Sequence, residues 1–148
     1  MLVFLRHAGC TFCREALGDI ARARRAIEEA GAKIILVHMR DSGQIQGLMW
    51  KYGLLGVDRI CDGDRQLYRA FGLKRGRLRQ LFGLHVFLRG VQAAVLRGHG
   101  MGRISADGFQ MPGLFLISGG GILQRFRHRT AADRPDYAGL CVGSGRRV

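Results

Sequence analysis

Two cysteines separated by two residues, Cys10 and Cys13, are the side chains of this sequence best suited to chemistry. They follow a short apolar run and precede a helical pattern, so they lie where a strand gives way to a helix. Unpaired backbone N–H groups and the positive end of the helix dipole favour an anion at that position. Arg6, His7 and Arg14 add positive charge nearby. We therefore expect a reactive thiolate with a lowered pKa, and a second sulfur close enough to form a disulfide with it.

A zinc site and a purely structural role are the alternatives for this pair. A tetrahedral zinc site needs two further ligands, commonly a second pair of closely spaced Cys or His residues. Cys61 and Cys141 are single cysteines, and the five histidines are scattered along the chain. Redox chemistry is therefore favoured, with no metal. We interpret Cys61 as a buried structural thiol or a remote resolving cysteine, and Cys141 as a residue near a mobile end that could form an intermolecular disulfide.

Composition and charge narrow the class of protein. A length of 148 residues with 47% hydrophobic and 24% charged residues is typical of one globular domain. No apolar run is long enough to cross a bilayer, and the opening residues 1–5 are too short for a signal peptide, so we expect a cytoplasmic protein with reduced thiols. The net charge of +13 could attract nucleic acid or an acidic partner. The sequence disfavours nucleic acid as a partner, because no arginine-rich run is interleaved with aromatic residues.

The order of apolar and helical patterns predicts βαβ units and a mainly parallel sheet. Thr11 is a candidate N-cap for the first helix, and Gly31 is a natural residue to end it. Trp50 and Tyr52 are expected to pack inside from the second helix. The predicted strands are 2–5, 33–38, 57–60, 113–118 and 122–128. The predicted helices are 11–31, 43–53 (capped by Asp41 or Ser42), 64–72 and a last helix within 131–141, with Pro135 near its first turn.

Residues 77–98 are apolar but interrupted by arginines, which favours a core-packing helix or helix pair. A basic amphipathic segment on a membrane surface is the alternative. Residues 99–109 are predicted to form a glycine-rich loop, and 142–148 a frayed tail. No phosphate-binding glycine motif opens a helix, so no nucleotide or flavin cofactor is expected. We expect one domain over residues 1–148.

Four separated blocks together resemble a known family. They are "VFLRHAGCTFCRE" (3–15), "RICDGDRQLYRAFGL" (59–73), "QMPGLFLIS" (110–118) and "AADRPDY" (131–137). In this order they are similar to the peroxiredoxin-like AhpC/TSA branch of the thioredoxin superfamily, which includes selenoprotein L/U-like and peroxiredoxin-like 2 proteins. The resemblance implies an α/β thioredoxin-like fold, with a mixed sheet flanked by helices and a helical insertion before a cis-proline loop. It places Met111 and Pro112 in that loop, with a cis peptide bond between them.

The resemblance also implies roles for the cysteines. Cys10, nearer the helix start, would attack a disulfide or peroxide substrate, and Cys13 would resolve the intermediate. Arg6, His7, Thr11 and Arg14 would shape this site together with the proline loop. Thioredoxin, glutaredoxin or a small thiol would be the reductant. The expected function is therefore a thiol–disulfide oxidoreductase or a peroxiredoxin-like antioxidant protein.

Two departures from that family bear on activity and assembly. Peroxiredoxins carry a threonine three residues before the reactive cysteine, and here Cys10 or His7 stands at that position, depending on which cysteine is aligned. Neither supplies the hydroxyl that holds the peroxide. The N-terminal strands usual in the family are also absent, which would leave a sheet edge exposed and favour a homodimer. A non-catalytic, redox-sensing binding module with a basic surface is the alternative function.

Overall fold

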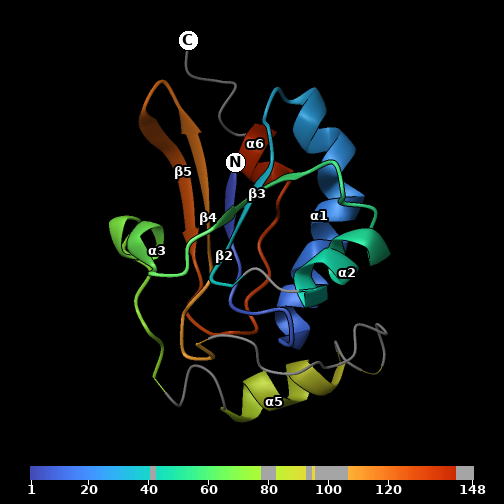
Figure 1. Cartoon of the computed structure of the whole chain (residues 1–148), viewed down its shortest axis with the longest axis vertical. Coiled ribbons are helices and arrows are strands. Elements are labelled where there is room, and N and C mark those ends of the chain that lie inside the picture. Colours follow the sequence, from blue (N-terminus) through green and yellow to red (C-terminus); the bar gives the residue numbers. More distant parts are fainter. Residues whose placement is uncertain (41–42, 78–82, 93–94, 96–106, 143–148) are drawn as a thin grey trace.

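A five-stranded mixed sheet forms the centre of the fold, and helices lie on both of its faces (Figure 1). The structure, a computed structural model, describes residues 1–40, 43–77, 83–92, 95 and 107–142. The strands are β1 (Leu2–Phe4), β2 (Ile35–His38), β3 (Asp58–Cys61), β4 (Gly113–Ser118) and β5 (Gly121–Arg127). The helices are α1 (Thr11–Glu29), α2 (Gly43–Lys51), α3 (Gln66–Ala70), α5 (Leu84–Val91) and α6 (Gly139–Val142).

The strand order is β3-β2-β1-β4-β5, which makes β1 the central strand. β1 pairs in parallel with β2, and β2 pairs in parallel with β3. β4 runs antiparallel to β1 and forms a hairpin with β5. This arrangement confirms the predicted α/β class with a mixed sheet, and α5 lies within the insertion predicted between residues 77 and 98.

Both faces of the central strand are buried, as is usual where helices cover a parallel sheet. Val3 packs into the larger apolar cluster, which contains Leu17 of α1 and Leu36 of β2. Phe4, on the other face, joins a second cluster with Tyr68 of α3. The buried side chains on both faces fix the position of β1, so the loop that follows Phe4 starts from a fixed point.

Helix α1 begins and ends close to the predicted residues. Thr11 is its first helical residue, and Cys10, with an extended backbone, takes the N-cap position instead. The helix stops before Gly31, whose φ of 79° is a left-handed conformation that glycine adopts without steric cost. The N-cap of α1 is therefore a cysteine, whose side chain lies at the positive end of the helix dipole.

Two side chains predicted to be buried are exposed. Trp50 is 74% exposed because Ile45, Leu48 and Met49 form the buried face of α2, and Trp50 lies one residue beyond it. Cys61 is also exposed, because β3 is an edge strand whose four residues all face solvent. The prediction that Cys61 is a buried structural thiol is therefore wrong. Tyr52, by contrast, is partly buried against the larger cluster.

The C-terminal segment is less helical than predicted. Only Gly139–Val142 is helical. Asp133 instead closes a turn, because its carboxylate accepts hydrogen bonds from the backbone of Arg129 at 2.6 Å and of Thr130 at 3.2 Å. Pro135 also disfavours helical geometry at the preceding residue. It lies ahead of α6 rather than in the first turn of a helix.

Cys141 has a different environment from the one expected at a mobile end. Its thiol is buried, 4.0 Å from the sulfur of Met1, so it is not displayed for an intermolecular disulfide. Several predictions lie outside the described residues: the caps at 41–42, most of the glycine-rich loop and the tail beyond 142. Within the described ranges, no helix is both long enough and apolar enough to span a membrane.

Candidate redox site

Cys10 and Cys13 lie at the carboxyl end of the central strand, where β1 leads through a short loop into α1. The loop is closed by a backbone hydrogen bond of 3.0 Å from the N–H of Cys10 to the carbonyl of His7. Arg14 closes the first turn of the helix with a bond of 3.1 Å from its N–H to the carbonyl of Cys10. The two sulfurs are therefore held by a strand end and a helix start, both rigid elements.

Arg6 contacts both sulfurs. Its side-chain Nη1 lies 3.4 Å from the Sγ of Cys10, and its backbone N–H donates to the Sγ of Cys13 at 3.3 Å. The side chain is itself buried, with 7% exposed. A buried guanidinium is always charged, so it favours an anion on the sulfur beside it.

The two cysteines have opposite tendencies to ionise. The pKa of Cys10 is lowered to about 6, mainly because the Cys13 thiol donates a hydrogen bond to it. Burial opposes this shift, while the charge of Arg6 and the backbone N–H groups of Cys13 and Phe12 support it. The pKa of Cys13 is raised, first by that same hydrogen bond and then by burial. The arrangement thus provides a thiolate at Cys10 and a protonated thiol at Cys13 near neutral pH.

The remaining predicted residues surround the pair in different ways. His7 is buried, and burial together with Arg6 lowers its pKa to about 4, so it is neutral at pH 7. The Nε of Arg14 donates to the carbonyl of Ala8 at 3.1 Å, which stabilises the loop. Thr11 is buried in the first turn of α1. Arg6 is therefore the charged side chain in direct contact with the thiolate.

The proline loop lies beside the cysteines, as the resemblance implied, but its peptide bond does not have the expected form. No peptide bond in the described residues is cis, so the bond between Met111 and Pro112 is trans. Trans is the lower-energy form of most X–Pro bonds, by about 0.5–1 kcal/mol. Pro112 still lines a cavity of about 20 Å³ together with Arg6 and Cys13. That volume is enough for one water molecule.

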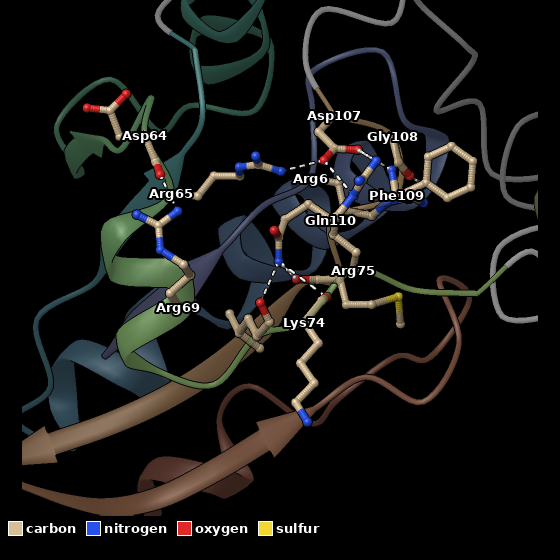
Figure 2. A network of polar contacts seen from close by, with 12 residues as sticks. Arg6, Asp64, Arg65, Arg69, Lys74, Arg75, Asp107, Gly108, Phe109 and Gln110 are labelled. Atoms are coloured by element: carbon tan, nitrogen blue, oxygen red, sulfur yellow. Dashed lines mark hydrogen bonds and ion pairs between the residues drawn. The ribbon is translucent and has the colours of Figure 1, made fainter.

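A polar network that the sequence did not reveal joins Arg6 to the segment preceding the proline (Figure 2). The Nη2 of Arg6 donates to the carbonyl of Gly108. The neighbouring Asp107 is ion-paired with Arg65 at 2.5 Å and with Arg75 at 3.0 Å. The sequence indicates Arg6 as a site residue, but not its partner Gly108 or the neighbouring Asp107. Arg6 and Gly108 are 102 positions apart, and no local pattern connects them.

Gln110 fixes the other end of the same segment. Its side-chain amide donates to the carbonyls of Leu73 at 2.9 Å and Met111 at 3.3 Å, and more weakly to that of Lys74 at 3.4 Å (Figure 2). Gln110 is itself 2% exposed, so its amide is satisfied by these carbonyls and ties the segment before the proline to residues 73–74. The only sequence signal was its position directly before the Met-Pro dipeptide.

Helix α5 packs over the start of α1. Arg89 lies 3.3 Å from the buried carboxylate of Glu15, and Val86 joins a small apolar cluster with Met111 and the partly buried Phe12. In Figure 1, α5 lies across the end of the molecule where α1 begins. Helix α5 therefore packs against the first turns of α1, the helix that begins at the cysteine pair.

The described residues contain no group of three or more His, Cys, Asp or Glu side chains arranged to hold a metal ion. Cys61 lies on the exposed edge strand and Cys141 is buried beside Met1. Neither is among the contacts of the pair in the described part of the chain.

Comparison with known proteins agrees with this architecture. A family described as "AhpC/TSA antioxidant enzyme" matches residues 19–131. The human protein "Peroxiredoxin-like 2C" is 29% identical over 77 residues, which are 51% of this chain and 34% of that protein, so the match spans about a third of the relative's length. The family match begins at residue 19, after both cysteines, so the argument for the pair is independent of it. With its mixed sheet and this match over most of its length, the chain belongs to the AhpC/TSA antioxidant enzyme family.

Proposed function

We propose that this protein is a thiol-dependent oxidoreductase in which Cys10 is the nucleophile and Cys13 the resolving thiol. One observation carries the proposal: Arg6 contacts both sulfurs, with its guanidinium 3.4 Å from the Cys10 Sγ and its backbone N–H donating to the Cys13 Sγ at 3.3 Å. With a pKa of about 6, about nine-tenths of Cys10 is ionised at pH 7. A thiolate attacks disulfides and peroxides, whereas a thiol does not.

With a disulfide substrate, the Cys10 thiolate attacks one sulfur, forms a mixed disulfide and releases the other half as a thiolate. Cys13 then loses its proton and attacks Cys10, which releases the second half and leaves a Cys10–Cys13 disulfide. The substrate is reduced by two electrons, and the pair is oxidised by two. A thiol reductant such as thioredoxin, glutaredoxin or a small thiol returns the two electrons, and Cys13 regains its proton while Cys10 returns to the thiolate.

With a peroxide substrate, the thiolate attacks one oxygen of the O–O bond. Cys10 becomes a sulfenic acid, and the other oxygen leaves as an alcohol or water after taking up a proton. The Cys13 sulfur then attacks the sulfenic sulfur, and water leaves as the same disulfide forms. Both routes end in one oxidised state, so a single experiment detects either of them.

In the test, the reduced protein is treated with one equivalent of hydrogen peroxide or of hydroxyethyl disulfide, alkylated and digested with trypsin. The masses of the resulting peptides are then measured. Cleavage after Arg6 and Arg14 gives one peptide that contains both cysteines. We expect that peptide to lose two hydrogens and to resist alkylation. Cys10→Ser abolishes the change, and Cys61→Ser, on the exposed edge strand, leaves it intact.

The outcomes separate the candidate functions. Free, slowly alkylated thiols at both positions would refute the redox proposal. A disulfide that forms once, but that none of the three reductants resets, would favour the redox-sensing binding module over the enzyme. Repeated turnover with a reductant, lost in Cys10→Ser, supports the oxidoreductase.

A further inference from the structure

A second, larger cavity borders the proline loop. It is a groove of about 460 Å³, in the range of about 300–1,000 Å³ that is typical of small-molecule sites. Pro112 and His128 line both this groove and the cavity of about 20 Å³ that Cys13 also lines. The groove therefore shares a wall with the redox site.

The charge of the groove is strongly one-sided. Four of its lining residues are permanently cationic near neutral pH, and none is acidic; the cations are Lys74, Arg75, Arg77 and Arg127. The imidazole of His128 adds no charge at pH 7, because burial lowers its pKa to about 4. The groove therefore attracts an anion, and nothing on its walls repels one.

Two of these cations are not neutralised by the protein. Asp107 pairs with Arg75, but neither Lys74 nor Arg127 forms an ion pair within the described part of the chain. In Figure 2 the ammonium group of Lys74 points away from the polar network formed around Gln110. Its charge is left for a ligand, and among the residues that the structure describes its side chain makes no hydrogen bond that a substitution would remove.

Arg127 is held in place for such a role. Its Nη2 donates to the carbonyl of Phe71 at 2.9 Å, and its guanidinium lies 5.8 Å from the centre of the Phe115 ring. Gly72 makes room for it, since a Cβ there would lie 2.9 Å from Nη2. A pre-positioned guanidinium loses little freedom when it binds a carboxylate, which it can contact with two parallel hydrogen bonds.

We propose that this groove binds the carboxylates of a small, anionic thiol or disulfide of about tripeptide size and presents its sulfur to the cysteine pair. The volume accommodates a few residues, the two unneutralised cations match two carboxylates, and the shared wall at Pro112 places the ligand beside the redox site. This inference rests on the proposed function, because it names the substrate class of that site.

The test measures binding with a probe that cannot react. S-methylglutathione carries two carboxylates and a blocked sulfur, and its diethyl ester carries no carboxylate. We expect the wild-type chain to bind the acid at low ionic strength, and to bind the diester at least about fivefold more weakly. We also expect a loss of about fivefold or more for the acid in Lys74→Gln/Arg127→Gln, because each exposed charge contact contributes up to about 1 kcal/mol.

Two further proteins keep the test decisive. The control Lys51→Gln/Arg25→Gln also removes one lysine and one arginine charge, but from α2 and α1 outside the groove. Its affinity for the acid should match that of the wild type. Lys74→Gln alone removes no hydrogen bond of the fold and should still weaken binding. If the double variant loses affinity only because it is misfolded, its thermal unfolding midpoint falls while that of Lys74→Gln does not.

Several results would overturn the inference. They are no binding of the acid, equal affinity for acid and diester, or a loss in the control as large as that in the groove variant. Binding of a short single-stranded oligonucleotide that depends on Lys74 and Arg127, without binding of the acid, would assign the groove to phosphates instead. None of these results affects formation of a Cys10–Cys13 disulfide with hydrogen peroxide, so the groove and the redox proposal fail separately.

Discussion

Replacing Cys13 by alanine should make Cys10 less acidic. The hydrogen bond from the Cys13 thiol is the largest cause of the lowered Cys10 pKa. A hydrogen bond to a charged group contributes about 1.5–3 kcal/mol, and one pKa unit corresponds to about 1.36 kcal/mol. Loss of this bond should therefore raise the pKa of Cys10 from about 6 to roughly 7–8. Arg6 and the helix start remain, so the pKa stays below the ordinary value for a thiol.

This shift is large enough to measure as a rate. At pH 6.5 the ionised fraction of Cys10 falls from about three quarters to between about a quarter and a few hundredths. Alkylation of Cys10 by iodoacetamide should therefore slow by about three- to twenty-five-fold at that pH. At pH 9 both proteins are almost fully ionised at Cys10, so their rates should converge. The rate is followed by mass spectrometry on the tryptic peptide from residue 7 to residue 14.

Two comparisons make the result specific to the hydrogen bond. Cys13→Ser retains a hydroxyl donor and should raise the pKa of Cys10 less than Cys13→Ala does. The exposed thiol of Cys61, alkylated in the same sample, should react at the same rate in all three proteins. A wild-type profile with its midpoint near 9, or identical profiles for the wild type and Cys13→Ala, would refute the reasoning.

Two further predictions concern the packing around the site. Gly113→Ala should lower the free energy of unfolding by about 1–3 kcal/mol, because the new Cβ would lie 2.6 Å from Cδ2 of the buried Leu73. The control Gly47→Ala, in α2, should raise it by about 0.5–1 kcal/mol, because a Cβ there would meet no described atom within 4 Å beyond its own turn of helix. Urea unfolding that fails to separate the two would contradict the packing argument. Arg134→Gln should cost about 1–3 kcal/mol at pH 7, because Arg134 donates two hydrogen bonds to the buried carboxylate of Asp19. Burial alone would raise the pKa of Asp19, but hydrogen bonds and charges from Arg134 and Arg22 outweigh burial and lower that pKa. The stabilisation by the Arg134–Asp19 contact is therefore present above about pH 4 and is lost as the pH falls below that value. Urea unfolding at pH 7 and pH 3 should show the gap between wild type and variant closing, and an equal gap at both would contradict the assignment.

The elements that local patterns specify were predictable. β4 occupies Gly113–Ser118, as predicted, because a short apolar run between a proline and three glycines leaves little choice. The start of α1 was predictable to within one residue, since a cysteine at the end of a strand and a helical repeat from Thr11 are both visible in the sequence. The location of the candidate redox pair followed from these two elements alone.

Features that depend on tertiary neighbours were not predictable. The strand containing Cys61 was recognisable, but its place at the sheet edge, which exposes the thiol, follows from the strand order. Exposure of Trp50 depends on which face of α2 meets α1. The contact between Arg6 and Gly108 joins two parts of the chain that share no pattern. Such properties arise from the assembled fold and have no local signature.

Arg6 stabilises the Cys10 thiolate and so affects the reduction potential of the proposed redox pair. It is a buried, permanent cation, and in the described part of the chain it forms no ion pair with a carboxylate, so the Cys10 thiolate is the anion that it faces. A thiolate with a pKa of about 6 stabilises the reduced protein at pH 7 by about 1.4 kcal/mol relative to an ordinary thiol. Oxidation would remove that anion, while the hydrogen bond from Arg6 to the carbonyl of Gly108 would remain. Because about 1.4 kcal/mol corresponds to about 30 mV for a two-electron couple, the lowered Cys10 pKa, to which Arg6 contributes after the Cys13 hydrogen bond, would favour the reduced form of the proposed redox pair by about that much.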